Sequence, residues 1–262
     1  MIAVWCNRMK PVSDARGLVS MNRVGASCCV SRTLIHLIIL LSAATGCVLG
    51  QSAGTFTATG SMTTARSRHI TLSFFDNSGN PLSVPLSLPQ TGATTTTSAL
   101  TNTLAAGAML LVQTRAQDGL PAAEWSTQLT TTGNIGGFEI FRSTTFSQEA
   151  SAPLETRTPN SFVLVFDDTD GQATGVALAN VANSPANIIV NVRDDTGALL
   201  QTGSINLAAQ GHTSFLLPAA YTSAANVRGM VEFLVPTGGK ISVIGLRAKA
   251  DGTVTTIPVL AK

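Results

Sequence analysis

The stretch RHITLSFFDNSGNPL at residues 68–82 aligns without gaps with ANIIVNVRDDTGALL at residues 186–200, at an offset of 118 positions. A second pair follows in the same order, TTTGNIGGFEIFR at 130–142 and VPTGGKISVIGLR at 235–247, at an offset of 105. Matched blocks in one order are typical of an internal duplication, and a duplication decides the fold before any single motif does. The sequence therefore predicts two similar units in tandem.

The two predicted copies are not equal in extent. A third matched block, TLAAGAMLLV at 103–112 with NLAAQGHTSFLL at 206–217, lies between the other two. The second copy also has an apolar stretch at residues 162–166 before its first matched block, whereas the first copy runs back there into the N-terminal segment. We therefore expect that the first unit is one strand short, or that 162–166 bridges the two units.

Apolar side chains alternate with polar ones inside each matched block. Ile188, Val190 and Val192 fall on one face of an extended chain, as period two requires of a half-buried strand. Turn signals such as DNSG and DDTG separate the strands. The pattern predicts an all-β fold of two tandem antiparallel immunoglobulin-like β-sandwich domains, at 51–158 and 159–262. The polar stretch TGATTTTSALTNT at 91–103 predicts a loop, or a glycosylated surface.

Residues 1–50 have the order of an export signal, a signal peptide with a dispensable N-terminal extension. Basic residues precede the apolar run TLIHLIILLSAATG at 33–46, and small residues follow it. The run is shorter than the roughly 20 residues that cross a bilayer, so no transmembrane span is expected in the mature chain. The functional start is expected at Met21 or Met9. The protein is thus predicted to be exported, and to be secreted, periplasmic or on the cell surface.

Two processing reactions compete at this site. Cleavage after Gly50 would start the mature chain at Gln51. Alternatively, ATGC ending at Cys47 is similar to a bacterial lipobox, and Cys47 would then be lipidated and anchor the protein, although Ala44 stands where leucine is usual. All four cysteines lie within residues 1–50, so after cleavage behind Gly50 no disulfide or thiol chemistry remains.

The charge balance argues against nucleic acid as a partner. Only 11% of the residues are charged, and five basic and one acidic residue lie within residues 1–50. The remainder has 11 basic and 13 acidic side chains, a net charge of −2. A nucleic-acid partner requires a basic face that displaces counterions from phosphate, and residues 51–262 have no Lys/Arg cluster.

No pattern predicts a catalytic site, so the chain is not expected to be an enzyme. GQSAG around Ser52 matches the nucleophile-elbow pattern, but it lies on the cleavage site without the strand and helix that the elbow needs. Residues 51–262 contain two histidines, His69 and His212, in no metal-ligand spacing, and both are expected at the surface or at strand edges. An unrecognised hydrolase would need one of them beside a serine and an aspartate.

Three further residue groups carry hypotheses. Asp167, Asp168 and Asp170 in DDTDG predict either a hairpin turn or a weak calcium site, the only cofactor considered. For sugars, Trp125 is expected in a core and Tyr221 is the surface candidate. The repeat-matched pairs Asp76/Arg142 and Asp194/Arg247 are each expected to lie together at a sheet end.

The phrases FFDNSGNPL, FEIFR, GVALAN, VRDDTGALL, GHTSFLL and ISVIGLR resemble repeat modules found near the ends of many secreted or surface bacterial proteins. The resemblance covers about residues 56–262 and implies β-sandwiches without an established activity. It implies a structural, adhesive or assembly module of the cell envelope, with an envelope protein or an extracellular polysaccharide as the partner. A polysaccharide-binding accessory protein is the alternative.

Overall fold

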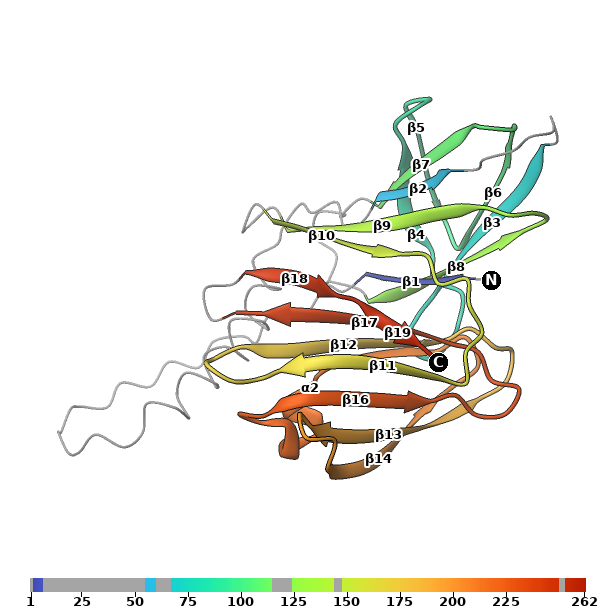
Figure 1. Cartoon of the computed structure of the whole chain (residues 1–262). Helices are drawn as coiled ribbons and strands as arrows, with labels where there is room; N and C mark the ends of the chain where they lie inside the picture. Colours follow the sequence, from blue (N-terminus) through green and yellow to red (C-terminus); the bar gives the residue numbers. More distant parts are fainter. Residues whose placement is uncertain (1, 7–54, 60–66, 115–123, 144–147, 250–252) are drawn as a thin grey trace, which may run out of the picture.

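The computed structural model describes residues 2–6, 55–59, 67–114, 124–143, 148–249 and 253–262 (Figure 1). Strands make up most of these residues, and every strand pair within the sheets is antiparallel. The all-β prediction is therefore confirmed. Among the described residues no helix has both the length and the hydropathy needed to cross a membrane.

Two sheets form the N-terminal half of the molecule, the upper part of Figure 1. Sheet A has the order β1-β8-β3-β6 and sheet B the order β10-β9-β2-β7-β4-β5. Their strands are β1 (Ile2–Cys6), β2 (Thr55–Thr59), β3 (Arg68–Phe75), β4 (Val84–Leu88), β5 (Ala93–Thr97), β6 (Ala99–Leu104), β7 (Met109–Thr114), β8 (Trp125–Thr131), β9 (Gly136–Ser143) and β10 (Gln148–Pro153).

Two more sheets form the C-terminal half. Sheet C has the order β14-β13-β16-β11-β19 and sheet D the order β15-β12-β17-β18. Their strands are β11 (Ser161–Asp167), β12 (Ala173–Asn180), β13 (Ala186–Asp194), β14 (Leu199–Leu207), β15 (His212–Leu216), β16 (Arg228–Leu234), β17 (Ile241–Ala248), β18 (Val254–Ile257) and β19 (Val259–Ala261). A short helix, α2 (Leu217–Ala220), and a 3-10 turn, η1 (Thr222–Ala224), follow β15.

Each half buries an apolar cluster between its own two sheets. In the N-terminal half, Ile70, Leu72 and Phe74 of β3 face Leu86 of β4 and Val112 of β7. Trp125 of β8 is in the same cluster at 8% exposure, which confirms its predicted core position.

The C-terminal core depends on the strand that has no repeat match. Phe162, Leu164 and Phe166 of β11 are each at most 1% exposed, and they pack against Val190 of β13 and Phe233 of β16. The predicted alternation on β13 is confirmed, because Ile188, Val190 and Val192 are fully buried. β11 therefore supplies three of the largest side chains of this core.

The polar stretch 91–103 forms strands, so the prediction of a loop there is wrong. β5 pairs with β4 along five residues, and β6 pairs with β3 along six. Threonine is β-branched and fits an extended backbone, and Thr71 and Thr101 place their hydroxyl oxygens 3.1 Å apart across the strand pair. Low complexity here reflects an exposed sheet surface.

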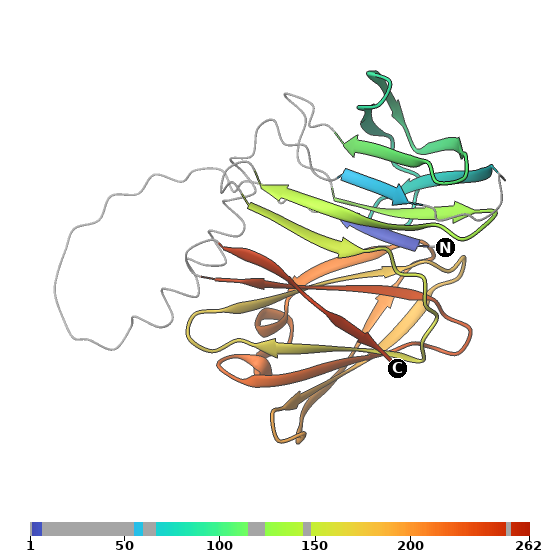
Figure 2. The same ribbon diagram turned by 45° about the horizontal axis from the view of Figure 1, so that its top comes forward.

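The two halves contact each other along two lines. Edge strands β10 and β18 lie side by side (Figure 2), and the backbone N–H of Val254 donates to Oε1 of Gln148 over 2.8 Å. At the other contact, the turn after β3 packs against the turn before β15, where the N–H of His212 donates to the carbonyl oxygen of Asn77 over 3.2 Å. Strand β1 also lies between the halves, since it contacts β12 and β17.

Candidate functional site

The acidic turn joins β11 to β12 and contains the predicted calcium ligands. Asp170 and Gly171 adopt positive φ, 53° and 74°, which closes the turn. Asp167 Oδ1 accepts hydrogen bonds from the backbone N–H and the hydroxyl of Thr169, at 3.2 and 2.6 Å. These are the contacts of an Asx turn, in which the carboxylate bonds to the backbone two residues further on.

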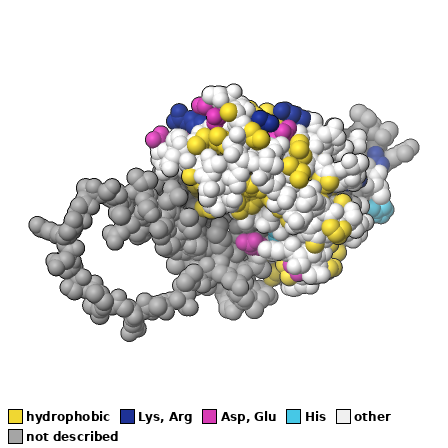
Figure 3. Space-filling view, turned by 90° about the horizontal axis from the view of Figure 1, so that it is seen from below, with side chains coloured by type: hydrophobic (Ala, Val, Ile, Leu, Met, Phe, Trp, Pro, Cys, Tyr) yellow, Lys and Arg dark blue, Asp and Glu magenta, His cyan; other side chains and the backbone are white. Residues whose placement is uncertain are grey.

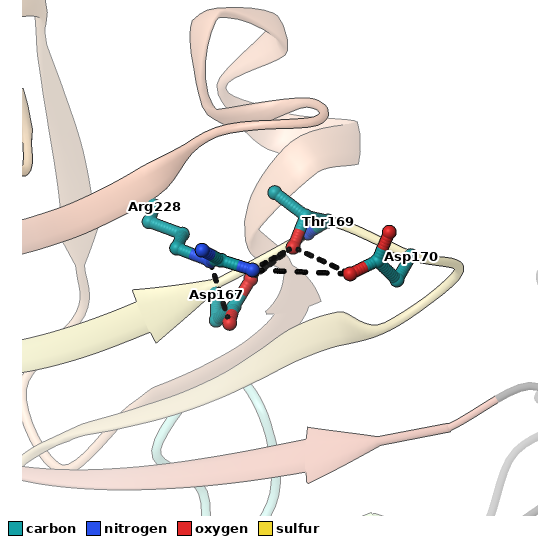
Figure 4. Close-up of polar contacts among 4 residues, drawn as sticks. All are labelled: Asp167, Thr169, Asp170 and Arg228. Atoms are coloured by element: carbon teal, nitrogen blue, oxygen red, sulfur yellow. Dashed lines mark hydrogen bonds and ion pairs between the residues drawn. The ribbon is translucent and has the colours of Figure 1, made fainter.

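Arg228 of β16 neutralises this turn from the neighbouring strand (Figure 4). Its Nε donates to Asp167 Oδ2 over 3.0 Å, and its Nη2 lies 3.8 Å from Asp170 Oδ2. The Thr169 hydrogen bonds, followed by the charge of Arg228, lower the pKa of Asp167. The carboxylates of Asp167 and Asp170 thus lie beside a cation of the same chain, Arg228.

Asp168 lies apart from its two neighbours, because it is buried at 3% exposure. Its Oδ1 accepts from the backbone N–H of Thr174 over 2.6 Å, while its Oδ2 has no hydrogen-bond partner. Burial raises the pKa of Asp168 to about 6, against the lowering effects of the Thr174 bonds and the Arg247 charge. This carboxyl is therefore an internal group at the base of the turn.

The three aspartates do not form a ligand shell. Asp167 is half-buried and Asp170 is exposed, and both lie beside Arg228, whereas Asp168 is buried against Thr174. Within the described part of the chain, no group of three or more His, Cys, Asp and Glu residues is arranged to hold a metal ion. The geometry is that of the other predicted structure, a hairpin turn.

His212 is buried and begins β15, an edge strand of sheet D, so of the two positions predicted for it, surface or strand edge, only the strand edge holds. It is 2% exposed at the contact between the two halves, and burial lowers its pKa to about 4 although the Asp76 backbone and charge act in the opposite direction. His69 is exposed, as predicted, and its Nδ1 lies 3.1 Å from the Thr103 hydroxyl. The two histidines therefore belong to different environments, one structural and one at the surface.

The predicted Asp194/Arg247 pair is absent from the ion pairs of the described residues. The Asp194 carboxylate instead accepts bonds from Thr196 and from the N–H of Ala198, which lower its pKa. Arg247 acts electrostatically on the buried Asp168. For the other pair, Asp76 is bound within its own turn, and the side chain of Arg142 lies outside the described residues.

Tyr221 was the predicted surface residue for stacking on a sugar, but its side chain is buried. It is 6% exposed within the C-terminal core, with its ring centroid 6.0 Å from that of Phe215. A short irregular segment was the reason to expect exposure, but α2 and η1 place this ring toward the sheets. Among described side chains, Phe138 is the one exposed large aromatic, at 39%.

The outer face of sheet C is the most distinctive surface of the described chain. Five of the eight exposed large apolar side chains lie on it: Val165, Ile189, Leu199, Leu234 and Leu260. Strand register brings them into neighbouring rows, since Ile189 pairs with Leu234 and Val163 pairs with Leu260. Figure 3 shows, from below, apolar patches separated by uncharged polar surface, with few charged groups. We call these five residues the sheet C patch.

The sequence did not single out this patch. Its residues come from five different strands, so only the pairing of the strands brings them together. The sequence held one signal, the continuous apolar run at 162–166. An alternating pattern would place a polar residue at position 165, whereas Val165 is apolar and faces outward at 53% exposure. The remaining predicted site residues, Ser52, Cys47 and Gly50, lie outside the described residues.

No protein-family model, curated protein or solved structure matches the chain. The fold and the surfaces described above are therefore the observations from which a function is argued.

Proposed function

We propose that the protein is an exported, non-catalytic binding module of the cell envelope, made of two tandem immunoglobulin-like β-sandwiches. The sheet C patch carries this proposal. Exposed leucine and valine at 53–56% on a single sheet face are costly to leave in water, and a group of exposed apolar side chains rimmed by polar residues is a feature of protein-binding sites. The partner is accordingly an envelope protein that presents an apolar surface.

The duplicated architecture supports the proposal. The repeat offsets place β3 on β13 and β9 on β17, and the matched strands occupy the same places in sheets A and C and in sheets B and D. Polar contacts join the halves at Asn77–His212, at Val254–Gln148 and between the side chains of Gln128 and Gln210. Two modules joined in this way present one continuous surface to a partner.

The chemistry of the buried polar groups is consistent with a structural role. His212 is shielded at the contact between the halves, and Asp168 accepts a backbone bond inside the turn. A hydrolase would need such a group beside an accessible nucleophile. A sugar-binding module would need exposed aromatic rings, and Tyr221 is buried.

The test is a binding assay with the exported protein immobilised and exposed to envelope extract and to insoluble polysaccharides, with and without calcium. A double variant, Val165→Lys with Leu260→Glu, places charges on the sheet C patch without touching a core. The matched control is Met109→Lys, because Met109 is 48% exposed on sheet B, away from the patch. We expect one envelope protein to be retained by the wild type and by the control, and to be lost with the double variant.

Equal retention by all three proteins would contradict a role for the patch. Retention of a polysaccharide in place of a protein would favour the alternative function, and calcium dependence would revive the acidic turn as a metal site. Cell fractionation with mass determination of the N-terminus tests export separately.

A further inference from the structure

Strand β1 occupies a place in sheet A that corresponds to the place of β11 in sheet C. In sheet A the order is β1-β8-β3, and in sheet C it is β11-β16-β13, with β8 and β3 matched to β16 and β13 by the repeat offsets. β1 pairs antiparallel with β8 over five residue pairs, and β11 pairs antiparallel with β16 over seven. The strand that the sequence comparison found missing from the first unit is thus supplied by residues 2–6.

The connection of this strand to its module is unlike that in the second module. β11 leads into β12 through a turn of five residues, 168–172, whereas β1 is separated from β2 by residues 7–54. The predicted export signal and both of its processing sites, Cys47 and Gly50, lie within that interval. Processing at either site, like a functional start at Met9 or Met21, would therefore leave sheet A without β1.

Export and the β1–β8 pairing are mutually exclusive within one chain. Residues before the apolar segment of an export signal stay on the cytoplasmic side while the mature chain crosses the membrane. After export, β8 would lose the partner that now pairs with residues 125–129. The vacated edge would present unpaired backbone N–H and C=O groups, which is the arrangement that accepts an additional strand.

The place that β1 fills is an enclosed one. Five residues of β8, Trp125, Ser126, Thr127, Gln128 and Leu129, are at most 8% exposed with β1 paired to them. Strands β12 and β17 of the other half form its opposite wall, since both contact β1. The corresponding strand in the second module contributes Phe162, Leu164 and Phe166 to its core, so a module without this strand lacks a comparable apolar contribution.

We propose that the exported protein accepts at this place a β-strand from another polypeptide, which pairs antiparallel with Trp125–Leu129 and completes the first module. The proposal rests on the export in the proposed function. The occupant comes from another chain because the described strands between residues 55 and 262 already have places in the four sheets. It is an uncharged, extended segment with alternating apolar side chains, because β8 (WSTQLTT) has no charge and the strand that now fills the place, IAVWC, has none either.

The experiment uses the protein recovered after export from cells that express the whole chain. Mass determination of its N-terminus comes first. The probe is a peptide of residues 1–8 with Cys6→Ser, labelled and titrated onto the exported protein. The control is the same peptide with Ala3→Pro and Val4→Pro. Neighbouring residues of an edge strand direct their N–H groups alternately toward and away from the paired strand, so one of the two prolines removes a donor to β8.

We expect saturable binding of the first peptide, binding of the double-proline peptide that is weaker by about tenfold or more, and slower hydrogen exchange of the amides of residues 125–129 in the complex. A cleaved protein that binds neither peptide, that binds both equally, or whose 125–129 amides are already protected would overturn the inference and leave export standing. A mass that includes residues 2–6 would overturn both the inference and the predicted processing.

Discussion

Two glycines at matched repeat positions provide a test of the contact between the halves. Gly79 and Gly197 end equivalent turns with φ of 85° and 87°, and each donates its N–H to the carbonyl oxygen of the aspartate three residues earlier. In both turns the aspartate Oδ1 accepts two further backbone bonds, at 2.8–3.0 Å. The local structures therefore match, and only their surroundings differ.

A Cβ atom added at Gly197 meets nothing within 4 Å, whereas one at Gly79 would lie 1.9 Å from the carbonyl oxygen of Ala209 in the other half. Gly197→Ala should thus cost about 1–2 kcal/mol of unfolding free energy, the cost of a left-handed conformation for an L-residue. Gly79→Ala should cost the same plus about 1–3 kcal/mol for overpacking, because the turn must retreat and weaken the Asn77–His212 bond.

The assay is urea unfolding of the wild type and both variants at one pH. Alanine reduces the freedom of the unfolded chain equally at both positions, so the difference between the variants isolates the contact between the halves. Equal losses at the two positions would refute this contact, whatever their common size.

Three further predictions concern buried groups. Burial lowers the pKa of His212 to about 4, whereas its unfolded value is near 6.5, so the unfolding free energy should fall by about 3 kcal/mol as pH falls from 6.5 toward 4. His212→Gln should flatten this decline in acid unfolding curves. The pKa of Asp168 is instead raised to about 6, so the unfolding free energy should fall as pH rises from 3.8 to 6. In urea unfolding, Asp168→Asn should therefore stabilise the protein at pH 7 by about 2–3 kcal/mol, with no gain at pH 3. For the buried Tyr221, Tyr221→Ala should lower the unfolding free energy by about 3–5 kcal/mol, and loss of sugar retention without loss of stability would contradict its core position.

Several elements were predictable because they depend on local chemistry. The alternation of Ile188, Val190 and Val192 predicted β13, and turn residues such as Asp194 and Gly197 predicted its end. For β13 the signal lies within a few residues of the feature, so period and turn chemistry suffice. Trp125 was expected in a core because it matches Met230 on a predicted strand of the other copy, and it is buried.

The errors share a different cause. Tyr221 was expected at the surface because it lies in a short irregular segment. His212 was expected at the surface or at a strand edge because it follows a turn glycine, yet both side chains are buried. Residues 91–103 were expected to form a loop because they are polar, but pairing with β3 and β4 makes them strands. Burial is a property of the assembled sheets, which local composition does not report.

The sequence by itself determined the all-β class, the duplicated order of strands and the expectation that one strand was missing from the first unit, since each of these follows from period, turn residues and self-comparison. Only the tertiary structure decided which residues meet: Arg228 with the acidic turn, the Gly79 turn with Ala209, the five side chains of the sheet C patch, and β1 in the place that corresponds to β11. The physical reason is that strand pairing joins residues separated by tens to more than a hundred positions, and its register, which no local pattern contains, determines what lies side by side.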